Sequence, residues 1–335
     1  MRFLEDFYGN ERQKAYFSSL IEEGKCSHAY ILEAPAGSGK KTFAKLLAAA
    51  LAFSSEKESE ERDAKCRRIM EGNSPDVMTL TREEGKKTIG VDATRDFCAS
   101  VYLTPSELNF KMYIFDEADR ITPQAQNALL KIIEEPPQGV YMMLLCENSL
   151  SLLSTVRSRA QKISLEVFDE AHLWDYAKKH MLEGADDDEK LGFAARMAGG
   201  SIGRLTALLS SGDTEFSAYT AAKRIVEMQV SKNRGISYFD FLKSIGDFAS
   251  SREALDALTK YLISAYGDLA RIQHADEAPL HFFTQEEAEK HSLFLSTDTI
   301  TRSFAAIDAV RADMQFNTSL PLSAAVLAMT LWKAV

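Results

Sequence analysis

The sequence has few cysteines and no long apolar run. Its four cysteines, Cys26, Cys66, Cys98 and Cys146, are scattered over 335 residues without paired spacing. This pattern argues against a disulfide framework and is typical of a reduced, cytoplasmic protein. No apolar run reaches membrane-spanning length and the N-terminus shows no signal-peptide pattern, so we expect no membrane partner. The six histidines show no metal-ligand spacing, and we predict no metal site.

The chain also lacks an excess of positive charge. It contains 39 Lys+Arg and 49 Asp+Glu, which gives a formal net charge of −10 at pH 7. Proteins that bind DNA mainly by themselves usually show a basic balance, so any DNA contact is expected to be local or shared with partners. The length suits two or three domains. A composition of 45% hydrophobic and 26% charged residues is typical of a soluble globular protein.

One stretch, residues 113–137 with the sequence YIFDEADRITPQAQNALLKIIEEPP, combines a strand signal with a helix signal. The apolar run Met112 to Phe115 predicts a buried strand. Asp116 and Glu117 follow at its carboxyl end, where ligands collect in parallel α/β sheets. Thr122 is placed to cap a helix that the two final prolines end. Two carboxylates there suit a nucleoside triphosphatase site that holds magnesium and orients a water. An ordinary strand–helix connection is the alternative.

A candidate phosphate loop follows the first apolar run, and it matches only part of the pattern G-x-x-x-x-G-K-[ST]. Gly39 and Lys40 match. Ala34 takes the place of the first glycine, and its Cβ would penalise a positive φ if the turn needs one. Lys41 takes the place of the Ser/Thr, which removes a magnesium-binding hydroxyl and adds a cation. Thr42 lies about 100° further round the helix and should not replace that hydroxyl.

The loop can still bind an anion. A lysine ammonium and consecutive backbone N–H groups at a helix N-terminus form a nest for phosphate. The pattern therefore predicts a phosphate loop with weakened chemistry, and it leaves nucleotide or anion binding without turnover open. The candidate nucleotide-binding residues of the loop are Gly37, Ser38, Gly39, Lys40, Lys41 and Thr42.

From Ser217 onward the apolar spacing is helical throughout and predicts a helical bundle. One stripe consists of Leu255, Leu258, Leu262, Ala265 and Leu269. A second stripe consists of Ile307, Val310, Met314, Leu320, Leu322 and Val326.

The run NALLKIIEEPP at residues 127–137, together with the phosphate loop, resembles the bacterial DNA polymerase III clamp loader subunits of the AAA+ class. The resemblance covers nearly the whole chain and is strongest from Ala29 to Arg204. It implies an α/β AAA+ module, with a parallel sheet flanked by helices, followed by a small helical lid and an all-α collar. The implied domains are a nucleotide-binding-like domain at 1–166, a lid at 167–213 and an oligomerisation collar at 214–335.

The resemblance assigns roles to further residues. Asp116 and Glu117 correspond to the Walker B pair, and Asn148 corresponds to the sensor 1 position. Ser158-Arg159 resembles the family's Ser-Arg-Cys motif, whose arginine reaches the γ-phosphate of a neighbouring subunit's ATP; a surface salt bridge is the alternative for Arg159. Arg204, after a glycine-rich turn, corresponds to the sensor 2 arginine.

The family's usual zinc module is reduced here. Where its members usually carry four zinc-binding cysteines, only Cys66 is present, and one cysteine cannot hold zinc. The charged stretch Ser54 to Lys65 is interpreted as a solvated connection. We therefore expect no zinc and no required cofactor, while ATP with Mg²⁺ stays open as an occupant.

Within the family, a delta-prime-type subunit fits better than a gamma/tau ATPase. The altered phosphate loop, the missing zinc cysteines and the end at residue 335 without a tail favour it. Such a subunit helps load the sliding clamp onto primed DNA, in a hetero-oligomeric ring with gamma/tau and delta subunits. It would offer Arg159 to a neighbouring ATP site and hydrolyse little ATP itself. A polymerase label would come only from membership of the complex.

Two alternatives stay open. One is a working AAA+ ATPase in which Lys40, Asp116, Glu117 and Arg204 act in cis. The other is an inert scaffold of the loader, in which even Arg159 has no catalytic role.

Overall fold

The structure, a computed structural model, describes residues 2–54, 56, 59–211, 213–232, 235–274, 279–316 and 318–335. It divides into two units. The first consists of Met1–Phe168 with Ser201–Gly203, and the second of Asp169–Gly200 with Arg204–Val335. The three predicted domains, 1–166, 167–213 and 214–335, stay a prediction.

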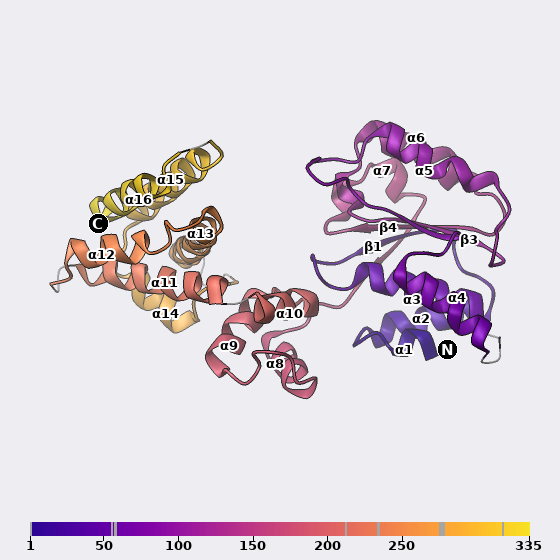
Figure 1. The fold of residues 1–335 in the computed structure, drawn as a ribbon, viewed down its shortest axis with the longest axis horizontal. Helices are drawn as coiled ribbons and strands as arrows, with labels where there is room; N and C mark the ends of the chain where they lie inside the picture. The colour runs from indigo at the N-terminus through magenta and orange to yellow at the C-terminus, as the bar shows by residue number, and fades with distance from the viewer. Residues whose placement is uncertain are drawn as a thin grey trace. The chain divides into compact units, whose positions relative to one another are not determined.

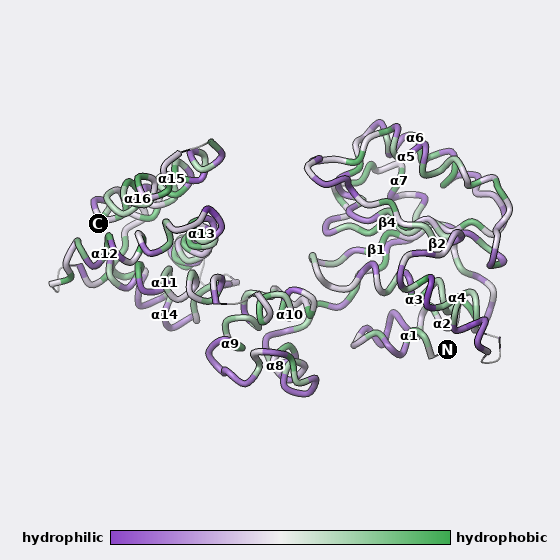
Figure 2. Tube along the Cα trace, viewed as in Figure 1, coloured by the Kyte–Doolittle hydropathy of each residue, from purple (hydrophilic) through white to green (hydrophobic). Residues whose placement is uncertain are grey.

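The first unit contains a five-stranded sheet in which all neighbouring strands are parallel. Its order is β2-β3-β4-β1-β5. The strands are β1 (Ala29–Glu33), β2 (Val77–Leu80), β3 (Lys111–Phe115), β4 (Val140–Cys146) and β5 (Gln161–Ser164). The three central strands are apolar and buried because helices cover both faces of the sheet. Figure 2 shows hydrophobic residues running through the middle of this sheet.

Helices lie on both sides of the sheet (Figure 1). One side carries α1 (Arg2–Glu5), α2 (Glu11–Glu22), α3 (Lys40–Phe53) and α4 (Glu60–Glu71); the other carries α5 (Val91–Cys98), α6 (Pro123–Glu134) and α7 (Ser154–Arg157). The described part of this unit also contains the short 3₁₀ helices η1 (Ala99–Tyr102), η2 (Ala118–Arg120) and η3 (Ser149–Ser151). Alternate residues of β1 enter opposite cores, Leu32 with the α3 side and Ile31 with the α6 side, as the pleat requires.

The charged stretch Ser54 to Lys65 is not wholly a connection, which corrects that prediction. Helix α4 begins within it at Glu60, and its N-cap Ser59 accepts a hydrogen bond from a first-turn backbone N–H. Acidic residues in the first turn and an i,i+4 ion pair between Glu61 and Lys65 (2.8 Å) add support. The prediction also covers residues 55, 57 and 58, which lie outside the described residues.

The second unit is helical throughout its described residues. Its helices are α8 (Glu170–Lys179), α9 (Asp188–Met197), α10 (Ile202–Ser210, whose first two residues belong to the first unit), α11 (Asp213–Val230), α12 (Tyr238–Gly246), α13 (Arg252–His274), α14 (Gln285–Ser292), α15 (Thr297–Asp313) and α16 (Leu320–Ala334). The predicted fold class, a parallel sheet flanked by helices followed by an all-helical region, is confirmed. No described helix has the length and hydrophobicity needed to span a membrane.

The predicted apolar stripes differ in outcome. The stripe on α13 is buried along its whole length. On α16, however, Leu322 and Val326 are 65% and 43% exposed, so the prediction that they share the buried stripe is wrong. The buried face of α16 instead includes Ala324, Leu327 and Ala328. Because α16 is apolar on most sides, the periodicity of its sequence does not identify the face that enters the core. Packing decides that face, since small alanines allow close approach of the neighbouring helix.

Candidate functional site

The phosphate loop connects β1 to α3. Gly37 and Gly39 take left-handed backbone conformations, with φ of 75° and 78°. A Cβ at Gly39 would lie 2.8 Å from the ring of Phe7, so this position also needs glycine for space. Ala34 does not adopt a positive φ, and its N–H donates to the Cys146 carbonyl at 3.1 Å. Alanine therefore costs no backbone strain at that position.

The Lys40 side chain folds back onto its own loop. Its ammonium Nζ donates to the carbonyl oxygens of Ala34 at 2.7 Å and Pro35 at 2.9 Å. Burial lowers the pKa of Lys40, although the nearby acidic groups, Glu147 first among them, oppose the shift. The lysine that would hold a phosphate thus already has two carbonyl partners.

Lys41 lies against Asp116, the first of the two predicted Walker B carboxylates. Its Nζ is 3.3 Å from Oδ2 of Asp116 and 3.5 Å from Oγ1 of Thr81. Thr42, the next residue of the helix, is exposed. An ammonium has no lone pair to offer a metal and repels a second cation. These residues therefore do not fit a P-loop magnesium site.

No other described group of side chains supplies a metal site in place of this one. Within the described residues, no cluster of three or more His, Cys, Asp or Glu side chains could hold a metal ion. Cys66, in α4, is half-buried beside the core on that side of the sheet, and burial raises the pKa of its thiol.

Glu117, the second predicted Walker B carboxylate, is paired with an arginine that the sequence pattern did not reveal. Arg82 Nε lies 3.0 Å from Oε2 and its Nη2 lies 3.4 Å from Oε1. Glu117 also has a positive φ of 53°, which is uncommon for a residue with a side chain. Arg82 follows β2 just as Glu117 follows β3, and the two strands are neighbours. The sequence signal that could have indicated this ion pair is the charged residue Arg82 just after the adjacent strand.

The segment after β4 is tied to the end of β1. Glu33 accepts a hydrogen bond from the Ser149 N–H at 2.6 Å and forms an ion pair with Lys162 at 2.7 Å. Burial raises the pKa of Glu33, but these partners outweigh it and the pKa is lowered overall. Asn148, the sensor 1 candidate, is exposed and accepts a bond from the Leu150 N–H at 2.9 Å. Its side chain thus caps η3.

The sensor 2 candidate lies beside a glycine that contacts the phosphate loop. The Gly203 N–H donates to the Gly37 carbonyl at 3.1 Å, and a Cβ at Gly203 would lie only 2.5 Å from that oxygen. Arg204 is the next residue and belongs to the second unit. There its charge is among those that lower the pKa of Glu215, which burial raises and hydrogen bonds from Tyr261 and other groups lower.

Arg159 is held at the surface by an acid. Its Nε lies 2.7 Å from Oε1 of Glu134, at the end of α6. Its Nη1 donates to the Thr155 carbonyl at 3.0 Å and to Ser158 Oγ at 3.3 Å. The adjacent Ala160, where the family motif has cysteine, is buried in the core beside α6. The Arg159 side chain is 39% exposed, so part of the guanidinium is accessible.

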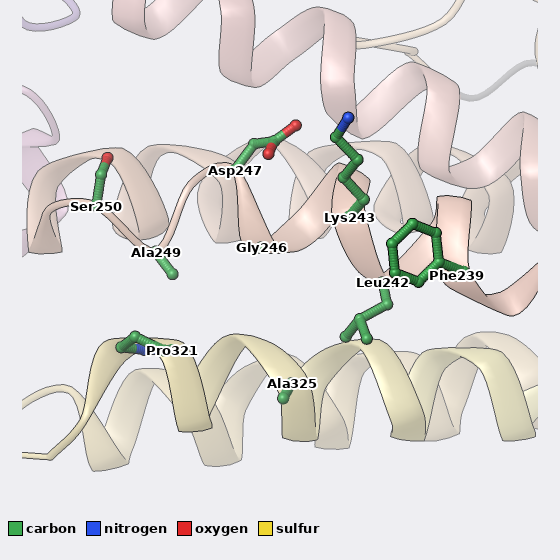
Figure 3. Close-up of a pocket in the computed structure, with 9 residues that line it drawn as sticks. All are labelled: Phe239, Leu242, Lys243, Gly246, Asp247, Ala249, Ser250, Pro321 and Ala325. Atoms are coloured by element: carbon green, nitrogen blue, oxygen red, sulfur yellow. The ribbon is translucent and has the colours of Figure 1, made fainter.

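A separate pocket of about 540 Å³ lies between α12 and α16 in the second unit (Figure 3). Its wall is largely apolar and includes Leu242 and Ala325, while Lys243 and Asp247 point away from α16. None of the predicted site residues lines it. The pocket is therefore distinct from the loop and arginine described above.

Comparisons with known proteins find relatives of the part of the chain that contains the sheet. Residues 9–169 match the family model described as "DNA polymerase III, delta subunit". The chain is 30% identical to DNA polymerase III subunit gamma of Buchnera aphidicola from Schizaphis graminum, over 53% of this chain and 50% of that protein. It is 34% identical to subunit delta' of Yersinia pestis, over 41% of each chain.

A third relative is subunit tau of Bacillus subtilis, with 32% identity over 49% of this chain and 29% of that protein. The matched stretch thus spans half or less of the length of each of these relatives. These matches show that residues 9–169, which contain the parallel sheet and the segment from Asp116 to Pro137, belong to the clamp loader subunit family of DNA polymerase III, close to gamma and tau.

Proposed function

We propose that this chain is a delta-prime-type subunit of the clamp loader, which hydrolyses little ATP itself and supplies Arg159 to the ATP site of a neighbouring subunit. The observation that carries the proposal is the pairing of its own catalytic groups. Lys40 is bonded to loop carbonyls, Lys41 neutralises Asp116, and Glu117 is paired with Arg82. Arg159 keeps an accessible guanidinium.

The size of the expected effect favours the arginine role over a structural one. A trans arginine accelerates phosphoryl transfer about 10³- to 10⁵-fold, or roughly 4 to 7 kcal/mol. An exposed ion pair such as that between Arg159 and Glu134 contributes about 0 to 1 kcal/mol. A sequence that keeps Ser158-Arg159 beside an altered phosphate loop is therefore better explained by catalysis in trans.

The partners follow from the same proposal. The chain assembles with gamma/tau and delta subunits in a hetero-oligomeric ring in the cytoplasm. Through that ring it acts on the sliding clamp and on primed DNA, without zinc and without a required nucleotide of its own. Its net charge of −10 agrees with DNA contact shared among subunits.

The test is ATP hydrolysis with Mg²⁺, measured for the purified chain and for the assembled loader containing wild type or Arg159→Ala. We expect no turnover by the chain alone, and a loss of about 10³-fold or more at the affected site of the assembled loader. Turnover by the isolated chain that depends on Lys40 and Glu117 would identify a gamma/tau-like ATPase. An assembled loader unchanged by Arg159→Ala would identify an inert scaffold.

A further inference from the structure

The contacts of Arg159 fall on two of its three guanidinium nitrogens. Nε forms an ion pair with Glu134 Oε1 at 2.7 Å, and Nη1 donates hydrogen bonds to the Thr155 carbonyl and to Ser158 Oγ. Within the described residues, Nη2 has no hydrogen-bond partner. A guanidinium has five N–H donors in a rigid plane, so the contacts on Nε and Nη1 fix the orientation of Nη2.

Helix stability does not explain Glu134. The residue is the last of α6, where the helix dipole is negative and an acidic side chain is unfavourable by about 0.3–1 kcal/mol. Glu135 follows it immediately and forms no ion pair within the described residues. Of these two adjacent, exposed glutamates, only Glu134 contacts Arg159, so the pairing is specific to one position.

We propose that Glu134 is a positioning residue, which holds Arg159 so that Nη2 is presented to the phosphate oxygens of a neighbouring subunit's nucleotide. The proposal rests on the proposed function of Arg159. A free arginine side chain has about 2 kcal/mol of rotamer entropy to lose on reaching a phosphate, and a side chain held beforehand loses less. Misplacement of a catalytic group by about 1 Å can cost about 10²-fold in rate.

The geometry favours positioning over inhibition. The ion pair between Glu134 and Arg159 is formed at Nε, at 2.7 Å, and within the described residues Glu134 makes no hydrogen bond to Nη2. An inhibitory carboxylate would compete with phosphate by taking the Nη2 group as well. The Glu134 side chain is itself 46% exposed, so water screens its negative charge. Glu134 therefore offsets only part of the positive charge of Arg159.

The experiment compares assembled loaders carrying wild type, Glu134→Gln, Glu135→Gln, Arg159→Ala and the Glu134→Gln/Arg159→Ala double variant. Loader assembly is checked by size exclusion, and kcat and KM for ATP are measured for each. We expect Glu134→Gln to lower kcat about 10-fold at the affected site, with KM unchanged within twofold. Glu135→Gln should match wild type, and Glu134→Gln should add no effect in the Arg159→Ala background.

The outcomes separate this inference from the proposed function. A wild-type kcat for Glu134→Gln, beside a large loss for Arg159→Ala, would overturn the positioning role and leave the arginine finger standing. A raised kcat for Glu134→Gln would overturn it too, in favour of inhibition. If Arg159→Ala had no effect, the proposed function would fail and this inference with it. An equal loss from Glu135→Gln would show a general charge effect and overturn the specific role.

Discussion

Lys41 and Asp116 form an ion pair, with Nζ 3.3 Å from Oδ2, although the two residues are 75 positions apart in the chain. Lys41 lies in the first turn of α3, and Asp116 follows β3. The pair joins the two halves of the predicted nucleotide site, and it places a cation beside the carboxylate that the sequence pattern assigns to magnesium.

We predict that Lys41→Thr makes nucleotide binding dependent on Mg²⁺. The threonine supplies the missing hydroxyl and frees Asp116, so the affinity for ADP should rise at least about 10-fold on adding Mg²⁺. Isothermal titration of ADP with Mg²⁺ or with EDTA measures this. Lys41→Met is the control, because it removes the charge without supplying a hydroxyl. A wild-type chain whose ADP affinity already rises with Mg²⁺ would contradict the prediction.

We predict that Gly203→Ala destabilises the first unit by about 1–3 kcal/mol, because the added Cβ would lie 2.5 Å from the Gly37 carbonyl oxygen. Chemical denaturation followed by circular dichroism measures the free energy of unfolding. Gly246→Ala is the matched control, since it is also helical and a Cβ there meets nothing within 4 Å. Equal effects of the two substitutions would show that the close approach of Gly203 is unimportant.

We predict that the stability contributed by Glu33 is lost in acid. Its pKa is below the ordinary value of 4.5 in the folded chain, so the unfolded chain binds the proton more readily. The contribution is therefore complete above about pH 4.5 and falls as pH drops through the folded-state pKa. Glu33→Gln should lower stability by about 1–2 kcal/mol at pH 7.

Thermal melts of wild type and Glu33→Gln, from pH 7 down to pH 3.5, test this directly. The difference in Tm should shrink as the pH falls. A difference that stays constant over this range would show that Lys162 and Ser149 do not stabilise the Glu33 carboxylate.

We predict that Asp268→Asn strongly destabilises the second unit. Asp268 is fully buried in α13, pairs with Arg271 at 2.7 Å and accepts backbone bonds from His281, Phe282 and Phe283. Loss of its charge should cost about 3–5 kcal/mol. Asp298→Asn is the control, because Asp298 is 68% exposed and its one ion pair within the described residues is with Arg302. Urea denaturation should give a change below about 0.5 kcal/mol for the control.

The sequence by itself determined the elements whose signals are local. Apolar runs located β1, β3 and β4 to within a residue or two, because buried parallel strands need continuous hydrophobic side chains. The Thr122 cap and the final prolines located α6. The glycines and Lys40 located the loop between β1 and α3, while its role as a phosphate loop stays a prediction.

Tertiary structure alone decided the contacts between distant residues. The pairs Lys41–Asp116 and Arg82–Glu117 form because α3 and the ends of β2 and β3 meet in the fold. The local periodicity of the sequence does not reveal the strand order that brings them together. Strand β5 was missed because its sequence QKIS is mostly polar and exposed, yet it pairs with β1. The buried face of α16 depended on its neighbours, since a helix that is hydrophobic on most sides leaves the choice to packing.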